Sequence, residues 1–500
     1  MSTYRSFFKN NLVVLSGQLL LYAQGVILMP IIIKTIGVRV YGGYGILVSI
    51  IGFVVGISSF GVGFRRSRFL PSARDTRERQ DLFFPQFYFH LASLMLLSLG
   101  LIFLYPTLDK IFFKGDVSFF IWLAVPYCFF YLLYSQTVDY FRYTHRIGYF
   151  NFFTLLFSFL NIALILLLYY FAFSLTINVL FSIQIAVSLS VALPLVFKTI
   201  KEIGLRWIIP TWNSLVEDIK LGFPLILVYI VDFVLNSSDR YVIAAFISIT
   251  AVGYYNSAYA LGSFIILLPK ISGVVLPPFI AKAVDTGKED EARMMVNYTV
   301  KGFLLAAIPF VVGSAVLSKP LLIIFANSEV ANNAYLVTPI VALGALFYGL
   351  NIILSNVLFV RLKTVMLFKM NFLAAILNLG LNLLIFYLIP NILVAAISTF
   401  LSYFIAFIFV HRAVTVDWPL DYDMKTIMKS GAAALCMALG LLAAGPWLAA
   451  GGWRLTTVLE AIVLGSVIYV VALVLLGTFS RREWLKLKEF VFKGDRAVGK

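Results

Sequence analysis

Residues 149–171 read YFNFFTLLFSFLNIALILLLYYF and contain no charged side chain. A helix needs about 20 predominantly apolar residues to cross the hydrocarbon core of a bilayer, so this stretch is long enough to span a membrane. Open sheet edges are not tolerated in hydrocarbon, and a long apolar run is therefore a helix, not a strand of an outer-membrane barrel. The stretch predicts an all-α membrane protein.

The composition of the whole chain agrees with this stretch. Of 500 residues, 61% are hydrophobic and 12% are charged, whereas about 25% are charged in an average soluble domain. A water-soluble globule of this composition would expose a very large apolar surface, and that class is excluded. Cys128 and Cys436 lie in apolar runs and allow neither a disulfide framework nor a thiolate metal cluster. We expect no bound metal ion and no cofactor.

Hydropathy along the chain predicts a polytopic protein with fourteen transmembrane helices. They are expected at residues 11–33, 41–63, 83–106, 117–138, 149–171, 175–197, 219–247, 253–280, 297–317, 335–360, 365–388, 391–410, 427–446 and 455–478. Because fourteen is an even number, both chain termini face the same side of the membrane.

The positive charges predict which side that is. With the N-terminus inside, 30 of the 39 Lys and Arg residues lie in inner segments and 6 in outer loops. The other three, Arg240, Lys270 and Lys301, lie within predicted spans. The positive-inside rule then places both termini in the cytoplasm of a multi-pass protein of the cell (inner) membrane. The net charge of +16 is explained by this topology, and no nucleic-acid partner is expected.

Two parts of the chain match each other. Residues 41–80 align without a gap on residues 251–290 with eight identities, and further identities occur at an offset of 217. Each repeat would hold six spans, an even number, so the repeats share one orientation about an axis along the membrane normal. This predicts two pseudo-symmetric six-helix lobes around a central cleft, with two C-terminal helices appended. The alternative is a chance recurrence of Gly-Tyr pairs.

The repeat sets the expected domain boundaries. They are an N-terminal lobe at 1–200, a cytoplasmic linker at 201–218, a C-terminal lobe at 219–412, spans 13 and 14 at 413–480 and a basic cytoplasmic tail at 481–500. Trp207 and Trp212 stand among basic residues in the linker, which is typical of an interfacial helix.

The seventh span carries a polar stripe. Tyr229, Asp232, Asn236, Asp239 and Arg240 lie on one helical face. Each charge at the bilayer centre costs about 2.5–3.5 kcal/mol on insertion, so the stripe must face protein or water. The alternative to a functional site is an ion pair that only holds helices together.

Further cations lie in or beside the spans. Lys270 is deep in the eighth span beside Pro269, which favours a helix that lines a cavity, although snorkelling to the interface is the alternative. Arg65, Arg66 and Arg68 end the second span.

For the remaining polar residues, a role in substrate binding and a purely structural role are both open. Arg142 ends the fourth span, and this arginine and those that end the second span are either anion-binding residues or plain topology determinants. Asn378 belongs to an Asn stripe in the eleventh span, where interhelical hydrogen bonding is the alternative to substrate contact.

Enzyme signatures are absent from the sequence. It contains neither a phosphate-cradling G-x-x-x-x-G-K-[ST] loop nor an H-E-x-x-H motif. We therefore expect a protein that is not an enzyme and does not hydrolyse nucleotides.

Several short motifs resemble a known family. They are VYGGYG at 40–45, FGVG at 60–63, RFL at 68–70, NSSDRY at 236–241, GYY at 253–255, GSVIY at 465–469 and RREW at 481–484. In this order and spacing they resemble the polysaccharide-transport (O-antigen/oligosaccharide) flippases of the multidrug/oligosaccharidyl-lipid/polysaccharide exporter superfamily. The resemblance implies two rocking lobes that move a polyprenyl-diphosphate-linked oligosaccharide to the outer leaflet for polysaccharide biosynthesis, usually driven by an ion gradient.

This reading assigns roles to the polar residues. Cations and amides would bind the diphosphate and glycan, and carboxylates would bind a coupling H⁺ or Na⁺. The substrate-binding candidates are Arg240, Lys270, Arg65, Arg66, Arg68, Arg142, Asn236 and Asn378, and the ion-coupling candidates are Asp239 and Asp232. The expected partners are the lipid-linked oligosaccharide, the coupling ion and membrane lipids.

Two other functions remain open. A multidrug/cation antiporter of the same fold would need an acidic, aromatic cavity in which Asp232 and Asp239 are not compensated. A membrane glycan polymerase or acyltransferase is disfavoured because the predicted outer loops are short.

Overall fold

The computed structural model describes residues 24–114, 121–171, 173–420 and 422–478. Within these ranges every regular element is a helix. After the short apolar helix Gln24–Thr35, the α-helices are α2 Val38–Ile57, α3 Gly63–Phe69, α4 Thr76–Leu108, α5 Ile121–Tyr143, α6 Ile147–Tyr170, α7 Ile177–Ile203, α8 Trp212–Phe246, α9 Ile249–Gly262, α10 Leu267–Asp285, α11 Glu289–Phe325, α12 Ser328–Ala334, α13 Val337–Val360, α14 Thr364–Leu388, α15 Ile392–Asp417, α16 Met424–Ala449 and α17 Leu455–Leu475.

These helices form where the apolar runs predict spans. In the described ranges, eleven helical segments are long and apolar enough to cross a membrane. The helix Gln24–Thr35, α5 and α8 occupy the positions predicted for spans 1, 4 and 7. The start of predicted span 1 lies outside the described residues. The structure is that of a multi-pass all-α membrane protein, and the count of fourteen remains a prediction.

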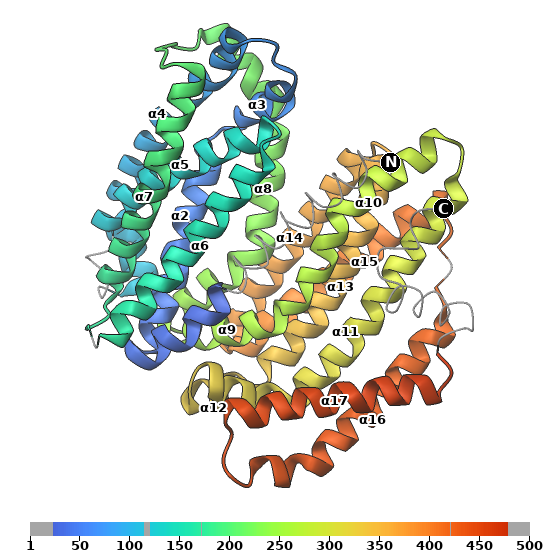
Figure 1. Ribbon diagram of the computed structural model, residues 1–500. Coiled ribbons are helices and arrows are strands. Elements are labelled where there is room, and N and C mark those ends of the chain that lie inside the picture. Colours follow the sequence, from blue (N-terminus) through green and yellow to red (C-terminus); the bar gives the residue numbers. More distant parts are fainter. Residues whose placement is uncertain (1–23, 115–120, 172, 421, 479–500) are drawn as a thin grey trace.

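Figure 1 shows two groups of helices with an appended pair. Helices α2–α7 form the first group, in which α5 packs on α6 and α7. In the second group α13 packs on α9, α10, α11 and α15, and α14 packs on α8 and α15. Helices α16 and α17 pack on each other and on the outside of α11. This grouping follows the predicted chain order, whereas the rotational symmetry of the lobes remains a prediction.

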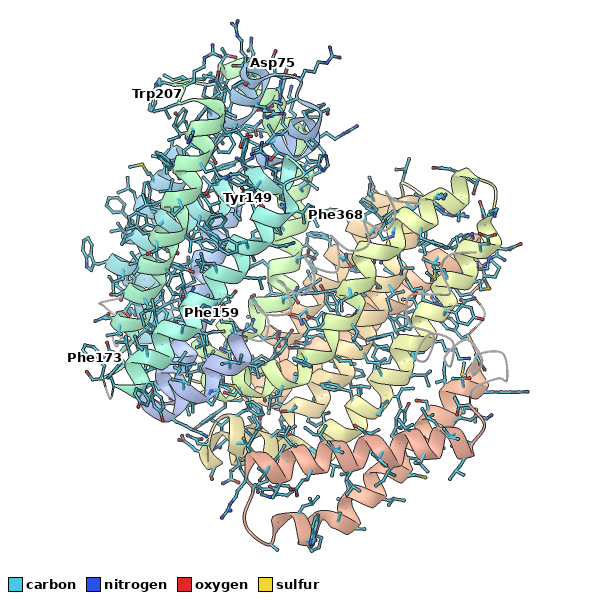
Figure 2. The ribbon with its side chains drawn as sticks, viewed as in Figure 1. Asp75, Tyr149, Phe159, Phe173, Trp207 and Phe368 are labelled. Atoms are coloured by element: carbon cyan, nitrogen blue, oxygen red, sulfur yellow. The ribbon has the colours of Figure 1, made fainter. Side chains whose placement is uncertain are left out.

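The two ends of the first group carry the loops that the topology assigns to opposite sides. Asp75 and Trp207, both in predicted inner segments, lie at one end, and Phe173, in a predicted outer loop, lies at the other (Figure 2). We call these the inner and outer ends.

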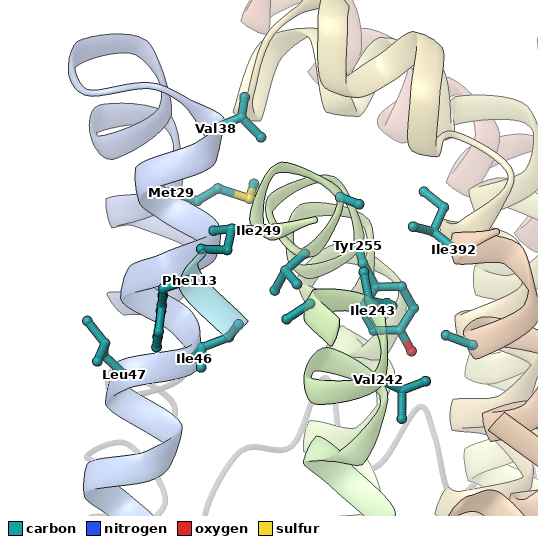
Figure 3. Packing of buried hydrophobic residues seen from close by; sticks show 14 of the residues in the cluster. Met29, Val38, Ile46, Leu47, Phe113, Val242, Ile243, Ile249, Tyr255 and Ile392 are labelled. Carbon is teal, nitrogen blue, oxygen red and sulfur yellow. The ribbon is translucent and has the colours of Figure 1, made fainter. Parts of the chain in front are cut away.

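The two groups touch at both ends of α2. Near the outer end Gly42 packs so closely on the backbone of Ile249 and Gly253 that a Cβ atom would collide with it. One apolar core joins the groups here, and it includes Val38 and Ile46 of α2 beside Ile249 of α9 (Figure 3).

Towards the inner end Gly61 and Gly222 make the same kind of backbone contact between the α2–α3 turn and α8. Only a residue without a side chain permits such an approach, and Gly61 also has a positive φ of 79°.

Candidate functional site

A hydrogen-bonded group of polar residues in the second lobe surrounds Asp239 of α8, which is 2% exposed. Its Oδ2 accepts hydrogen bonds from the Tyr255 hydroxyl at 2.6 Å and the Thr399 hydroxyl at 2.5 Å. Its Oδ1 accepts one from Asn382 Nδ2 at 2.6 Å. One carboxylate thus joins α8 to α9, α14 and α15.

Asn378 extends this group. Its Oδ1 accepts hydrogen bonds from the Ser238 hydroxyl at 2.8 Å and from Asn382 Nδ2 at 3.3 Å. We define the Asp239 cluster as Asp239, Tyr255, Asn378, Asn382 and Thr399. Among the described atoms, Asn382 Oδ1 is buried without a hydrogen-bond partner. Carboxylate, amide and hydroxyl oxygens are the ligands that hard cations prefer.

Arg240 has its own hydrogen-bond partners, although it follows Asp239 in the chain and lies within electrostatic range of its carboxylate. Its Nε donates to Asn256 Oδ1 and its Nη1 to the Asn236 carbonyl oxygen, both at 2.6 Å. The guanidinium lies 5.1 Å from the centroid of the Tyr259 ring. These partners are neutral, so the guanidinium keeps its net positive charge.

The rest of the predicted stripe precedes Asp239 on α8, towards the N-terminal end of the helix. Asn236 Oδ1 accepts a hydrogen bond from the Tyr403 hydroxyl at 3.1 Å, and its Nδ2 donates to the Asp232 carbonyl oxygen at 2.7 Å. Asp232 is an exposed residue of α8, and its carboxylate lies within electrostatic range of the half-buried Lys270. The predicted residues of α8 and α10 therefore belong to one region of the second lobe.

The predicted arginines of the first lobe have different surroundings. Arg65 of α3 forms an ion pair with Asp218 of α8 at 2.8 Å, and this pair links the two lobes beside the Gly61 and Gly222 contact. Arg68 is exposed. Arg142 pairs with Asp139 at 3.1 Å.

Arg66 is 3% exposed and inside the first lobe. It donates to Gln136 Oε1 and lies 5.4 Å from the ring centroid of Phe83. Gln136 Nε2 in turn contacts His90 Nδ1 at 3.0 Å, and His90 Nε2 contacts the Ser58 hydroxyl at 2.9 Å. A diphosphate cannot reach this guanidinium in the described arrangement, so a substrate role for Arg66 requires a conformational change.

The sequence pointed to only some members of these groups. Asn378 and Asn382 share a helical face by their i, i+4 spacing, which is a local signal. Tyr255 and Thr399 give no such signal because their partnership with Asp239 depends on the packing of distant helices. In the ranges that the structure describes, no group of three or more His, Cys, Asp or Glu residues could hold a metal ion.

Comparison with family models identifies the class. Residues 7–284, more than half of the chain, match the model described as polysaccharide biosynthesis protein, and the protein belongs to that family. Residues 224–384 also match the MatE model. A comparison with curated protein sequences finds no match.

Solved structures show the same fold. The lipid II flippase MurJ, in an inward closed conformation, is 15% identical with a TM-score of 0.71, and the match covers 93% of this chain and 98% of that one. An inward-facing multidrug resistance MATE transporter of the MOP superfamily is 14% identical with a TM-score of 0.58, covering 80% of this chain and 95% of that one.

A mutant of the Vibrio cholerae MATE transporter VcmN is 17% identical with a TM-score of 0.56, covering 83% of this chain and 98% of that one. The chain is therefore a multi-pass membrane protein with the transporter fold of the multidrug/oligosaccharidyl-lipid/polysaccharide exporter superfamily.

Proposed function

We propose that the protein moves a polyprenyl-diphosphate-linked oligosaccharide from the cytoplasmic to the outer leaflet for cell-surface polysaccharide biosynthesis. The observation that carries the proposal is the different surroundings of the two charged side chains on α8. Arg240 has neutral partners and keeps a positive charge for an anionic headgroup. Asp239 is buried and accepts three hydrogen bonds, so it is not presented to a cationic drug. The polysaccharide biosynthesis family and the fold of a lipid II flippase support the same substrate class.

Transport would use the two lobes as rigid bodies around the substrate. The proposed units are the predicted ones, 1–200 and 219–412, joined by the linker 201–218 and followed by 413–480 and the tail 481–500. The Arg65–Asp218 ion pair, which joins α3 of the first lobe to the N-terminal part of α8, would hold the inner ends together. A substrate diphosphate is a stronger partner for arginine than one carboxylate, so binding at Arg65 would release Asp218 and separate the inner ends.

The Asp239 cluster is the proposed site for a coupling H⁺ or Na⁺. Desolvation of a buried carboxylate is unfavourable unless a cation or hydrogen bonds compensate it. A cation at Asp239 would strengthen the junction of α8, α9, α14 and α15, and the positive charge of Arg240 nearby would oppose it. Occupancy of Arg240 by a diphosphate therefore favours cation binding, which couples the two ligands. Asp232 is the second coupling candidate.

Binding to the purified protein tests this assignment. The melting temperature is followed while a polyprenyl-diphosphate oligosaccharide or a cationic dye is added to wild type, Arg240→Ala, Lys270→Ala and the control Lys319→Ala. We expect the oligosaccharide lipid to bind wild type and the control equally. Loss of a charge-assisted hydrogen bond should weaken binding to the two site variants by about tenfold or more. Dye binding that is lost in Asp232→Asn and insensitive to Arg240→Ala would contradict the proposal.

The second candidate function is cation antiport. It is favoured by the match of residues 224–384 to the MatE model, whereas Lys270, which lies within electrostatic range of Asp232, opposes it. In that case a dye, and not an anionic lipid, would stabilise the wild-type protein in the experiment above.

A further inference from the structure

A cavity of about 350 Å³ lies outside the proposed transport site, between the inner ends of α11 and α16. Its volume is in the range of small-molecule sites, which is about 300–1,000 Å³. The α11 residues that line it run from Asp290 to Leu305 along one helical face. At 1.5 Å per residue this stripe is about 22 Å long.

The cavity changes from polar to apolar along its length. Asp290, Arg293 and Asn297 line the part before or at the start of the predicted span 297–317. Within the span the lining becomes more apolar, with Val300, Leu304 and Leu305 beside a single cation, Lys301. Given the predicted orientation, the cavity crosses the boundary between the inner headgroups and the hydrocarbon. An amphiphile that stands in the inner leaflet fits this gradient, whereas a wholly water-soluble ligand does not.

The charges in the cavity balance. Lys301 Nζ donates to Asp423 Oδ2 at 3.1 Å, and Arg293 Nη1 lies 3.6 Å from Asp290 Oδ1. The two cations and two carboxylates sum to zero. An anionic ligand would have to displace a carboxylate, whereas a zwitterion can bind both signs of charge at once.

Two polar atoms in the cavity wall point to a ligand. In the described structure Arg293 Nε, a donor, and Asn297 Oδ1, an acceptor, are buried without hydrogen-bond partners. Buried polar groups are almost always hydrogen-bonded, and leaving one unpaired costs about 1–3 kcal/mol. A donor and an acceptor that both lack partners match a ligand that carries both functions.

We propose that this cavity binds the headgroup of a zwitterionic membrane phospholipid of the phosphatidylethanolamine class. Its phosphate contacts Arg293 and Lys301, its ammonium contacts Asp290 and Asn297 Oδ1, and the start of its acyl chains packs on Leu304. The lipid joins α16 to α11 and so attaches the C-terminal helix pair to the second lobe. The inference does not depend on which substrate the protein transports.

Lipid titration of the delipidated full-length protein in detergent tests the proposal. The melting temperature is measured with dioleoyl phosphatidylethanolamine, dioleoyl phosphatidylglycerol and soluble phosphoethanolamine, for wild type, Arg293→Gln, Asn297→Leu and Thr299→Ala. Thr299 is the control because its hydroxyl donates within α11 to the Met295 carbonyl oxygen at 2.9 Å and does not line the cavity. Helicity of each lipid-free variant is recorded, so that misfolding is separated from lost binding.

We expect phosphatidylethanolamine to raise the melting temperature of wild type and Thr299→Ala in a saturable manner. Half-saturation should require about tenfold more lipid in Arg293→Gln and Asn297→Leu. Equal responses in all four proteins would overturn the site. A stronger response to phosphatidylglycerol would contradict the proposal that the ligand is zwitterionic. A response to soluble phosphoethanolamine equal to that of the lipid would contradict the proposal that the ligand is a lipid, because acyl chains would not contribute to binding. Displacement of the phospholipid by the oligosaccharide lipid would assign the cavity to the transport path and overturn the proposal.

Discussion

Asp239 shows how a single residue organises the second lobe. Its carboxylate accepts hydrogen bonds from three other helices, and without it the Tyr255 and Thr399 hydroxyls would be left buried without an acceptor. The sequence predicted its polar helical face because that pattern is local. It did not predict Tyr255 or Thr399, because only the packing of α9 and α15 brings these residues to Asp239.

The Asp239→Asn substitution tests this residue. The amide NH₂ cannot accept a hydrogen bond, so one of the donors loses its partner and the protein loses about 1–3 kcal/mol of stability. We expect a lower melting temperature and loss of any response to Na⁺ or pH in transport. The control Asp285→Asn makes the same chemical change at an exposed residue. It should leave the melting temperature and the ion response of transport unchanged. A variant that keeps its ion response would exclude Asp239 as the coupling residue.

Asp423 gives a prediction about pH. Hydrogen bonds from the Thr426 hydroxyl and backbone N–H, together with Lys301, lower the pKa of the Asp423 carboxyl from 3.8 to about 2. A lowered folded-state pKa contributes stability above about pH 4 that is lost as the pH falls towards 2. The melting temperature of wild type should therefore exceed that of Asp423→Asn at pH 6, and the difference should shrink between pH 4 and pH 2. A constant difference over this range would contradict the assignment.

At the scale of elements, the apolar runs predicted where helices lie but not where they break. The predicted span 253–280 is divided by a short 3₁₀ turn, Ser263–Ile266, between α9 and α10. Pro269 follows four residues after Ile265 and has no N–H to donate to that carbonyl oxygen, which explains the local change of helix type. Helices α4 and α11 also extend beyond their predicted spans, because polar turns can continue a helix outside the hydrocarbon.

The glycine contacts at the two ends of α2 predict that glycine-to-alanine substitutions at the two contacts separate the lobes at opposite ends of the molecule. Gly42→Ala should force α2 from α9 at the outer end, and Gly222→Ala should force α8 from the α2–α3 turn at the inner end. Spin-label distances are measured between Phe173 and Asn333 for the outer end and between Ser72 and Leu362 for the inner end. Each variant should lengthen only the distance at its own end.

The matched control for these variants is Gly302→Ala, since a Cβ atom there has open space. It should change neither distance. If Gly42→Ala and Gly222→Ala also leave both distances unchanged, the lobes do not separate at these contacts.

At the scale of the whole molecule, the sequence predicted the membrane class, the helix order and the appended pair α16–α17. It placed Arg65, Arg66, Arg68 and Arg142 together as possible anion ligands. The structure gives them different surroundings: Arg65 forms an ion pair with Asp218 of α8, Arg68 is exposed, and Arg66 is buried in the first lobe within electrostatic range of Arg142 and Asp139. Such partnerships depend on long-range packing, which neither spacing nor hydropathy encodes.

The Arg65–Asp218 pair gives a prediction at this scale. Arg65→Asp and Asp218→Arg each place like charges opposite one another and should increase the inner distance between Ser72 and Leu362. The double variant restores the attraction with reversed signs and should recover the wild-type distance. Failure of the double variant to recover it would mean that the pair does not hold the inner ends together.

The central claim is that the chain translocates a lipid-linked oligosaccharide through a site that contains Arg240. The most direct measurement is translocation of a labelled polyprenyl-diphosphate oligosaccharide in sealed vesicles, with and without an imposed proton or sodium gradient. The account predicts that wild type moves the label between leaflets, that a gradient changes its steady-state distribution and that Arg240→Ala moves none at normal protein levels. Translocation that is equally fast in wild type, in Arg240→Ala and in vesicles without protein would contradict it.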